Sequence, residues 1–267
     1  MSQDRADYGL DAPGVVRNLL LAGGAALLLA LLVRAGVVPR VVRLGPVGFD
    51  LLGTGLGAGL ALMFGGLWII YSSRIGKRRR RERLLDALNW TGGEMVLDVG
   101  CGRGLMMIGA ARRLTSGRAV GIDIWRSEDL SGNRPEATLA NAAAEGVSDR
   151  VRVETADMRK LPFPDDAFDV VLSCFAIHNL DAPGDRDTAI AEISRVLKPG
   201  GRALIDDIRH ISQYRNGLAL GGCRIVRRLD NPLWSLAWTA ISWGSLWPGT
   251  LLVEKRVERR ETRDRSL

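Results

Sequence analysis

The sequence has few of the residues that build metal centres and disulfide frameworks. Its 267 residues include three cysteines and two histidines, and no two cysteines form a C-x-x-C pair. Because zinc and related sites draw on closely spaced Cys and His ligands, the sequence predicts no metal site. Free thiols without a pairing pattern fit a reducing cytosol, where disulfides are rare. The cysteines are Cys101, Cys174 and Cys223.

Aromatic residues are also scarce, at 6% of the chain, and they are not interleaved with basic residues. Surfaces that bind single-stranded nucleic acid combine positive charge with stacked aromatic rings. The formal net charge of +7 comes largely from one basic cluster, residues 74–83 (R-I-G-K-R-R-R-R-E-R). We therefore infer no RNA or DNA substrate.

Charge is missing from two long runs in the N-terminal third of the chain. Residues 18–33 contain no charged side chain, and neither do residues 51–73. A helix needs about 20 apolar residues to cross the hydrocarbon core of a bilayer. The second run has that length, and the first reaches it if the arginines that flank it extend to the interface. We therefore predict a transmembrane helical hairpin over residues 16–73, with spans at about 17–36 and 51–73.

Glycines in the second run support a close pair of membrane helices. Gly53 and Gly57, like Gly55 and Gly59, have the small-x-x-x-small spacing that lets such helices approach. A cleaved signal peptide would end at a small-residue cleavage site and would leave the second run unexplained. The other alternative is a buried hairpin in a soluble protein, but the domain that follows needs no further apolar helices for its core.

The basic cluster at residues 74–83 indicates how this hairpin is oriented. The positive-inside rule places a cluster beside a span in the cytoplasm. Two spans then return the N-terminal tail, residues 1–15, to the same side and leave residues 36–50 outside, with Arg40 and Arg43 as weak counter-evidence. Anionic lipid is a simpler partner for the cluster than nucleic acid. We predict a multi-pass cell-membrane protein whose termini and soluble domain are cytoplasmic.

The most informative segment is V-L-D-V-G-C-G-R-G, residues 96–104. It predicts a buried strand, an acid at Asp98 and a turn containing Gly100, Gly102 and Gly104. Glycine has no Cβ and takes positive φ, so such a turn can approach a ligand closely. The glycine spacing of a dinucleotide-binding turn and the Lys of a phosphate-binding loop are both absent. An acid here suits a ligand with a cationic or hydrogen-bond-donating end; the alternative is a tight turn without a ligand.

Four further apolar segments predict strands that alternate with helices, as in a doubly wound α/β sheet. These strands cover residues 118–124, 151–158, 168–174 and 202–208. A helix over 188–197 would precede the last strand and end at K-P-G-G. Ligands of such sheets bind at the carboxyl ends of the strands, so we expect four side chains to meet there. They are Asp98, Asp123, Asp157 and Ser173.

These segments resemble the successive motifs of class I S-adenosylmethionine-dependent methyltransferases, above all the small-molecule branch that includes the quinone-ring methyltransferases. The motifs are residues 96–104, 120–124, 156–164, 166–174 and 192–201. The resemblance covers a domain of about residues 84–257. It implies a Rossmann-like, mostly parallel seven-stranded sheet that is closed by an antiparallel pair, residues 223–229 and 250–257, with S-adenosylmethionine as the cofactor.

The resemblance also implies which residues hold the cofactor. The turn glycines would wrap its methionine end, with Asp98 under the ammonium group and Ser173 on the same side. Asp123 would hold the ribose hydroxyls, Ile124 would lie on one face of the adenine, and Asp157 would accept from the adenine amino group. The full set of positions is Asp98, Gly100, Gly102, Gly104, Asp123, Ile124, Asp157, Met158 and Ser173.

His178, in A-I-H-N-L just after the fourth predicted strand, is the candidate general base. Methyl transfer requires a nucleophile in line with the sulfonium methyl group, and a base helps when that nucleophile carries a proton. The alternative is a loop histidine that packs or caps without taking a proton. His210, after the next predicted strand, is a weaker candidate.

A tryptophan-rich insert at residues 231–248 carries four of the seven tryptophans, ahead of a charged C-terminal tail at residues 258–267. Trp favours the membrane interface, which makes lipid contact as plausible here as a hydrophobic cap or a dimer patch. We therefore predict a membrane-anchored methyltransferase of a small, apolar acceptor: a quinone, a lipid or an isoprenoid. The alternatives are a cofactor-binding scaffold without catalytic activity, and a tethered methyltransferase of a soluble metabolite. The four tryptophans are Trp234, Trp238, Trp243 and Trp247.

Overall fold

A computed structural model describes residues 6–229, 235–236, 239 and 244–257. The chain divides into two compact units. The sheet unit comprises Met1–Asp7, Arg80–Trp125 and Arg134–Leu267, and the helical unit comprises Tyr8–Arg79 and Arg126–Asn133.

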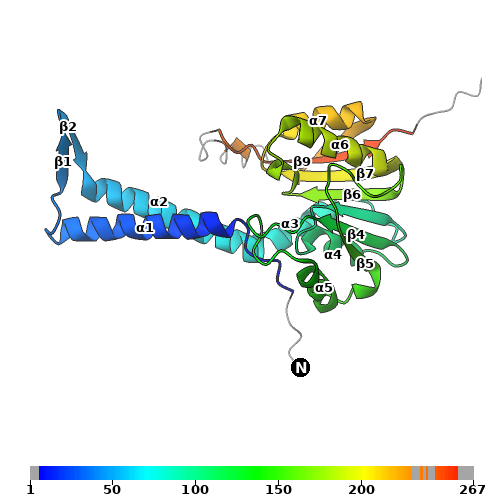
Figure 1. The fold of residues 1–267 in the computed structure, drawn as a ribbon, viewed down its shortest axis with the longest axis horizontal. Helices are drawn as coiled ribbons and strands as arrows, with labels where there is room; N and C mark the ends of the chain where they lie inside the picture. Colours follow the sequence, from blue (N-terminus) through cyan, green and yellow to red (C-terminus); the bar gives the residue numbers. More distant parts are fainter. Residues whose placement is uncertain (1–5, 230–234, 237–238, 240–243, 258–267) are drawn as a thin grey trace, which may run out of the picture. The chain divides into compact units, whose positions relative to one another are not determined.

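The sheet unit is built on a seven-stranded sheet in the order β5-β4-β3-β6-β7-β9-β8 (Figure 1). β9 runs antiparallel to both of its neighbours, and the other adjacent pairs are parallel. This order confirms the mostly parallel Rossmann-like sheet that the sequence predicted. The strands are β3 (Met95–Val99), β4 (Arg118–Asp123), β5 (Val151–Thr155), β6 (Phe168–Cys174), β7 (Leu197–Asp207), β8 (Cys223–Arg228) and β9 (Gly249–Lys255).

Helices cover both faces of this sheet (Figure 1). Because strand side chains alternate, the paired residues Leu97 and Val120 share one face and the next pair, Asp98 and Gly121, shares the other. Leu97 and Val120 join the core under α6 and α7, whereas a Cβ on Gly121 would come within 2.7 Å of Met107 in α4. The helices are α4 (Leu105–Ala111), α5 (Pro135–Ala144), α6 (Pro183–Val196) and α7 (Ile211–Leu220), with 3-10 turns η2 (Ser148–Arg150) and η3 (Ile177–Asn179).

The helical unit holds two long apolar helices joined by a short hairpin. α1 (Pro13–Arg34) and α2 (Leu51–Tyr71) flank the strands β1 (Val41–Leu44) and β2 (Val47–Asp50). A π-helical turn, η1 (Ser72–Gly76), and then α3 (Lys77–Leu85) continue α2. The apolar windows of the two helices have mean hydropathies of 2.1 and 1.6 and are only 17% buried, so both are candidate membrane spans by length and composition.

Glycines of α2 lie directly against α1. A Cβ on Gly55 would stand 2.9 Å from the carbonyl of Ala26, and one on Gly59 would stand 2.7 Å from the Leu27 side chain. Among the described residues, nothing lies within 4 Å of a Cβ built on Gly57. Of the two glycine pairs in the sequence, therefore, Gly55 and Gly59 line the helix contact, and Gly57 does not.

The largest departures from the predicted elements are at β7 and at the loop between the apolar helices. β7 begins at Leu197, directly after α6, so that K-P-G-G lies inside the strand rather than before it. Residues 41–50 form a β-hairpin where a loop was predicted. Three tryptophans of the insert, at positions 234, 238 and 243, lie outside the described residues, and Trp247 is 53% exposed.

Candidate active site

The turn after β3 has a backbone conformation that suits glycine. Gly100, Gly102 and Gly104 have φ angles of 73°, 52° and 84°. A Cβ on Gly100 would stand 2.3 Å from that of Ala176, and one on Gly104 would stand 2.8 Å from the Ile108 side chain. Both ends of the turn therefore require glycine for space as well as for φ.

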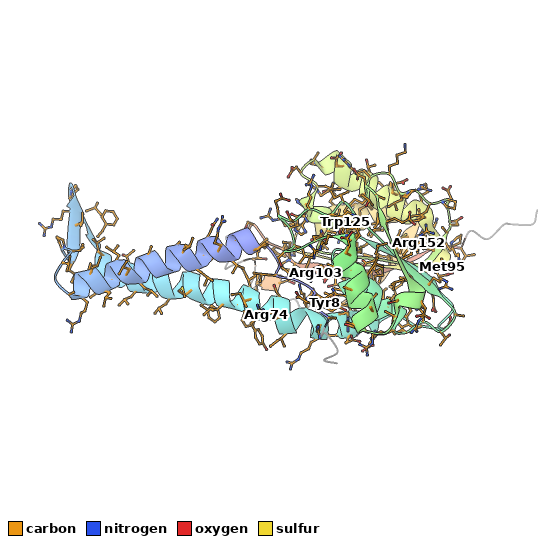
Figure 2. All side chains as sticks on the ribbon, turned by 60° about the horizontal axis from the view of Figure 1, so that its bottom comes forward. Tyr8, Arg74, Met95, Arg103, Trp125 and Arg152 are labelled. Atoms are coloured by element: carbon orange, nitrogen blue, oxygen red, sulfur yellow. The ribbon has the colours of Figure 1, made fainter. Side chains whose placement is uncertain are left out.

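Asp98 and Asp123, near the ends of β3 and β4, accept hydrogen bonds from backbone amides in this turn and just after it. Asp98 Oδ2 accepts a hydrogen bond from the Met107 amide at 2.8 Å. Asp123 Oδ2 accepts one from the Gly102 amide at 2.8 Å, and its Oδ1 accepts one from the amide of Trp125, labelled in Figure 2, at 2.7 Å. Asp123 thus bonds to the glycine turn directly, and Asp98 bonds to α4, the helix that follows the turn.

The Asp98 carboxyl group lies in the interior, where its side chain is 1% exposed. Burial raises its pKa to about 7; the hydrogen bond from Met107 opposes this rise, and the charge of Asp123 adds to it. A positive charge beside the carboxyl group would favour its ionised form. The position therefore suits a ligand with a cationic end.

The predicted adenine-side residues follow β4 and β5. Ile124 is 45% exposed and presents an apolar side chain beside Asp123. Asp157 pairs with Arg159, whose Nη2 lies 2.6 Å from Asp157 Oδ2, and Met158 packs half-buried against the core. A ligand that bonds to the Asp157 carboxylate would share it with this arginine.

Ser173 is bonded within the sheet. Its side chain is 2% exposed, and its hydroxyl donates to the Val99 carbonyl at 3.1 Å. This bond joins the ends of β6 and β3 beside the turn.

His178, in η3, pairs with an acid that the sequence reasoning missed. Its Nδ1 lies 2.5 Å from Oδ1 of Asp207, a residue of β7 that is 1% exposed. Because a carboxylate only accepts, Nδ1 carries the proton, and Nε2 is the ring nitrogen that can take another. Tyr214 adds a hydroxyl bond to the same carboxylate at 3.3 Å, and burial, together with the Asp207 charge, raises the pKa of Tyr214.

Known proteins match the part of the chain that carries these residues. A family model described as a methyltransferase domain matches residues 96–201. An uncharacterized protein of Haemophilus influenzae is 30% identical over 178 residues, which are 64% of this chain and 68% of that protein. The UbiE ubiquinone/menaquinone C-methyltransferase of Geobacter sulfurreducens is 36% identical over 129 residues, which are 48% of this chain. Residues 96–201 form a domain of the class I S-adenosylmethionine-dependent methyltransferases.

This methyltransferase spans less than half the length of several of its curated relatives, including 47% of the UbiE protein. Its fold is similar to that of geranyl diphosphate C-methyltransferase from Streptomyces coelicolor, with a TM-score of 0.55 and 20% identity. That match covers 71% of this chain and 83% of the other, whose crystal also holds S-adenosyl-L-homocysteine. The cofactor of this family is S-adenosylmethionine.

Two residues of α5 also bond to the backbone of the glycine turn, and the sequence did not predict either of them. The Thr138 hydroxyl donates to the Gly102 carbonyl at 2.7 Å, and Asn141 Nδ2 donates to the Arg103 carbonyl at 2.9 Å. Both side chains are buried. Their distance from the turn in the sequence, at 36 and 38 residues, left no local signal that would have found them.

Two arginines of the basic cluster are engaged within the sheet unit. Arg80 Nε and Nη2 donate to the two carboxylate oxygens of Asp206 at 2.8 and 2.6 Å, and the guanidinium lies 5.6 Å from the Phe175 ring. Arg81 is 4% exposed and pairs with Glu145 at 3.1 Å. These two arginines stabilise the sheet unit, whereas Arg79 remains exposed.

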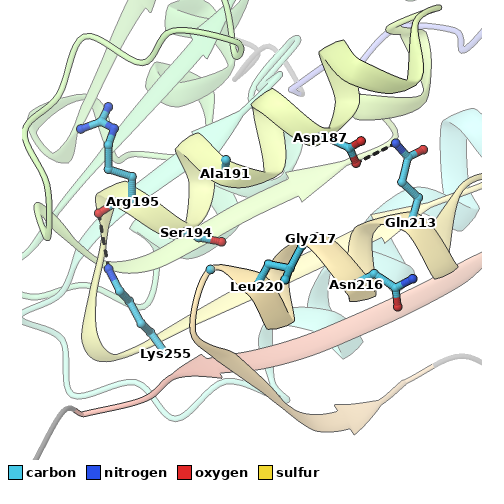
Figure 3. A pocket seen from close by; sticks show the side chains of 10 residues that line it. Asp187, Ala191, Ser194, Arg195, Gln213, Asn216, Gly217, Leu220 and Lys255 are labelled. Atoms are coloured by element: carbon cyan, nitrogen blue, oxygen red, sulfur yellow. Dashed lines mark hydrogen bonds between the residues drawn. The ribbon is translucent and has the colours of Figure 1, made fainter.

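A groove of about 800 Å³ lies between α6 and α7 (Figure 3). Its lining includes Asp187, Gln213 and Asn216 but none of the predicted cofactor residues. Gln213 bonds to Asp187 across it at 2.8 Å. The groove is therefore separate from the proposed reaction site.

Proposed function

We propose that this methyltransferase is anchored in the cell membrane by α1 and α2 and methylates a small, apolar acceptor of the quinone, lipid or isoprenoid class. The observation that carries the proposal is the presence of two long, largely unburied apolar helices in the same chain as the cofactor turn. UbiE, by its name, acts in quinone biosynthesis, and the geranyl diphosphate methyltransferase binds an isoprenoid diphosphate. The name of the UbiE relative supports an acceptor of the quinone class, whereas the geranyl diphosphate enzyme, at 20% identity, supports the fold.

The cofactor residues are proposed as the sequence predicted them. The bound cofactor would supply a methyl group on a sulfonium cation. Asp98 and the turn glycines would bind its amino-acid end, with Ser173 as support. Asp123, Ile124, Asp157 and Met158 would hold the ribose and adenine. Charge-assisted hydrogen bonds to these carboxylates are stronger than neutral ones, and they would orient the methyl group.

His178 would act as the general base. Its Nε2 would take the proton that the acceptor loses as the new bond to the methyl carbon forms. Asp207 holds the opposite side of the ring and would stabilise the imidazolium that results, which supports this role. The ring orientation therefore does not depend on the acceptor.

Calorimetry with S-adenosylhomocysteine on the full chain in detergent tests the cofactor site. We expect binding, and loss of binding in Asp123→Ala. The matched control is Asp187→Ala in the groove between α6 and α7. Failure of the unaltered protein to bind would remove the enzyme proposal, and binding without any methyl transfer would favour a scaffold.

Labelling with a membrane-impermeant maleimide tests the orientation in the membrane. Val47→Cys places a thiol on the exposed hairpin, and Leu220→Cys places one on the surface of the sheet unit, where Leu220 is 91% exposed. We expect intact cells to label the first variant and to label the second only after lysis. Equal labelling of both in intact cells would contradict the proposed orientation.

A further inference from the structure

The backbone of residue 7 is joined to the glycine turn through one buried amide. Asn141, 4% exposed, accepts from the Asp7 amide at its Oδ1, at 2.8 Å. Its Nδ2 donates to the Asp7 carbonyl at 2.8 Å and to the Arg103 carbonyl at 2.9 Å. The side chain of Asn141, in α5, therefore bonds both to the backbone of residue 7 and to the backbone of residue 103 in the glycine turn.

The charges of Asp7 and Arg103 add little to this link. Arg103, labelled in Figure 2, lies 3.1 Å from the Asp7 carboxylate, but the Asp7 side chain is 73% exposed. Solvent screens an ion pair of this kind, so its net contribution is small. The hydrogen bonds of Asn141 are partly buried, and the Asn141 amide itself is 4% exposed, so the loss of its partners is disfavoured.

The residues that follow Asp7 are held just as firmly within the helical unit. Tyr8 is 4% exposed, and Lys77 Nζ donates to the carbonyls of Tyr8 and Gly9, each at 2.8 Å. The Leu10 amide donates to the Ser131 hydroxyl at 2.7 Å. Ser131 belongs to the loop of residues 126–133, which joins the end of β4 to α5.

From these contacts we infer that residues 6 and 7, the N-terminal segment, are a positioning element of the cofactor site, acting through Asn141. The segment does not touch the reacting atoms; it limits the conformations of the glycine turn, so that less entropy is lost when the cofactor binds. The inference deepens the proposed function, on which it rests, by tying cofactor affinity to the residues that lead into α1.

The test compares the affinity for S-adenosylhomocysteine of the full chain with that of two variants in detergent. One variant lacks residues 2–7, and the other is Asn141→Ala. We expect the Kd to rise about tenfold in each, because the deletion removes two hydrogen bonds of Asn141 and Asn141→Ala removes three, while the acceptor KM stays unchanged. Asp7→Asn, which keeps the backbone bonds, should change the Kd less than about twofold.

Matched controls separate positioning from general damage. A chain lacking only residues 2–5 keeps Asp7, and Asn216→Ala removes an amide exposed on α7; both should bind as the full chain does. An unchanged Kd in the variant lacking residues 2–7 would overturn the inference, whatever the Kd of Asn141→Ala, because Asn141 also bonds to Arg103 directly. If the unaltered protein bound no S-adenosylhomocysteine, the proposed function would fall and the inference with it.

Discussion

At the residue scale, Asp98 carries an ionisable group into the interior beneath the cofactor turn. Burial raises the pKa of Asp98 to about 7 in the folded, cofactor-free protein. The folded protein therefore keeps a proton on this carboxyl group up to about pH 7, whereas the unfolded chain releases it at a much lower pH. A cationic ligand has the opposite effect, because it favours the carboxylate. Protein stability and ligand affinity should therefore respond to pH in opposite directions at this residue.

The first prediction follows from this opposition. Between about pH 5 and pH 7, the contribution of Asp98 should make the cofactor-free protein less stable by up to about 1.4 kcal/mol per pH unit, because only the folded state holds the proton there, and the loss should level off above pH 7. Affinity for the cofactor should rise through pH 7. Chemical denaturation and calorimetry across about pH 5–8.5 measure both effects. Asp98→Asn should flatten both profiles, and identical profiles for the two proteins would refute the assignment.

His178 gives the second prediction. His178→Ala should lower kcat by about 100-fold or more, with partial recovery at high pH where hydroxide replaces the base, and should leave the Kd of S-adenosylhomocysteine unchanged. Asp207→Asn should lower kcat less. His210→Ala is the matched control. Steady-state kinetics from pH 6 to 9 would test the role, and full turnover of His178→Ala at every pH would exclude a base there.

At the element scale, the strands could be predicted because their signals are local. Phe168–Cys174 is apolar and β-branched, and the structure gives it those bounds. The positions of Asp98 and Asp123 could be predicted because the apolar pattern located the ends of their strands. Asn141 and Arg80 could not be found in this way, because their partners lie 134 and 126 residues away and depend on how the elements pack. The β1–β2 hairpin has only a weak turn signal.

The contact between α1 and α2 gives the third prediction. Gly59→Leu should destabilise the helix pair by about 1–3 kcal/mol, because the added side chain would overlap Leu27. Gly57→Leu, two residues away, should change little. Thermal unfolding of the full chain in detergent compares the two variants. Equal destabilisation by both would mean that the helices do not pack through Gly59.

The start of α3 gives the fourth prediction. Arg80→Met would leave the fully buried carboxylate of Asp206 without its guanidinium, and we expect the free energy of unfolding to fall by about 3 kcal/mol. Arg79→Met should not change that free energy, but it should weaken binding to anionic vesicles by about 1 kcal/mol. Denaturation and vesicle co-sedimentation measure the two effects. A stable Arg80→Met protein would show that this pair is dispensable.

At the scale of the whole molecule, the proposal joins a cofactor site to a membrane anchor in one chain. Each part has its own support: the family for the cofactor, and the length and hydropathy of α1 and α2 for the anchor. An anchored enzyme has its acceptor concentrated in two dimensions, so a membrane-partitioned molecule is the substrate that benefits from the arrangement. The acceptor itself leaves no signal in the sequence, because the fold serves many acceptors.

The most direct test reconstitutes the full chain into vesicles made from total membrane lipid and supplies S-adenosylmethionine with a deuterated methyl group. Mass spectrometry then follows the label in the organic and aqueous extracts. We predict a labelled product in the organic extract that is absent with Asp123→Ala. Two results would contradict the claim that the acceptor is membrane-partitioned. One is label that appears only in the aqueous extract when soluble metabolites are added, and the other is no transfer although the cofactor binds.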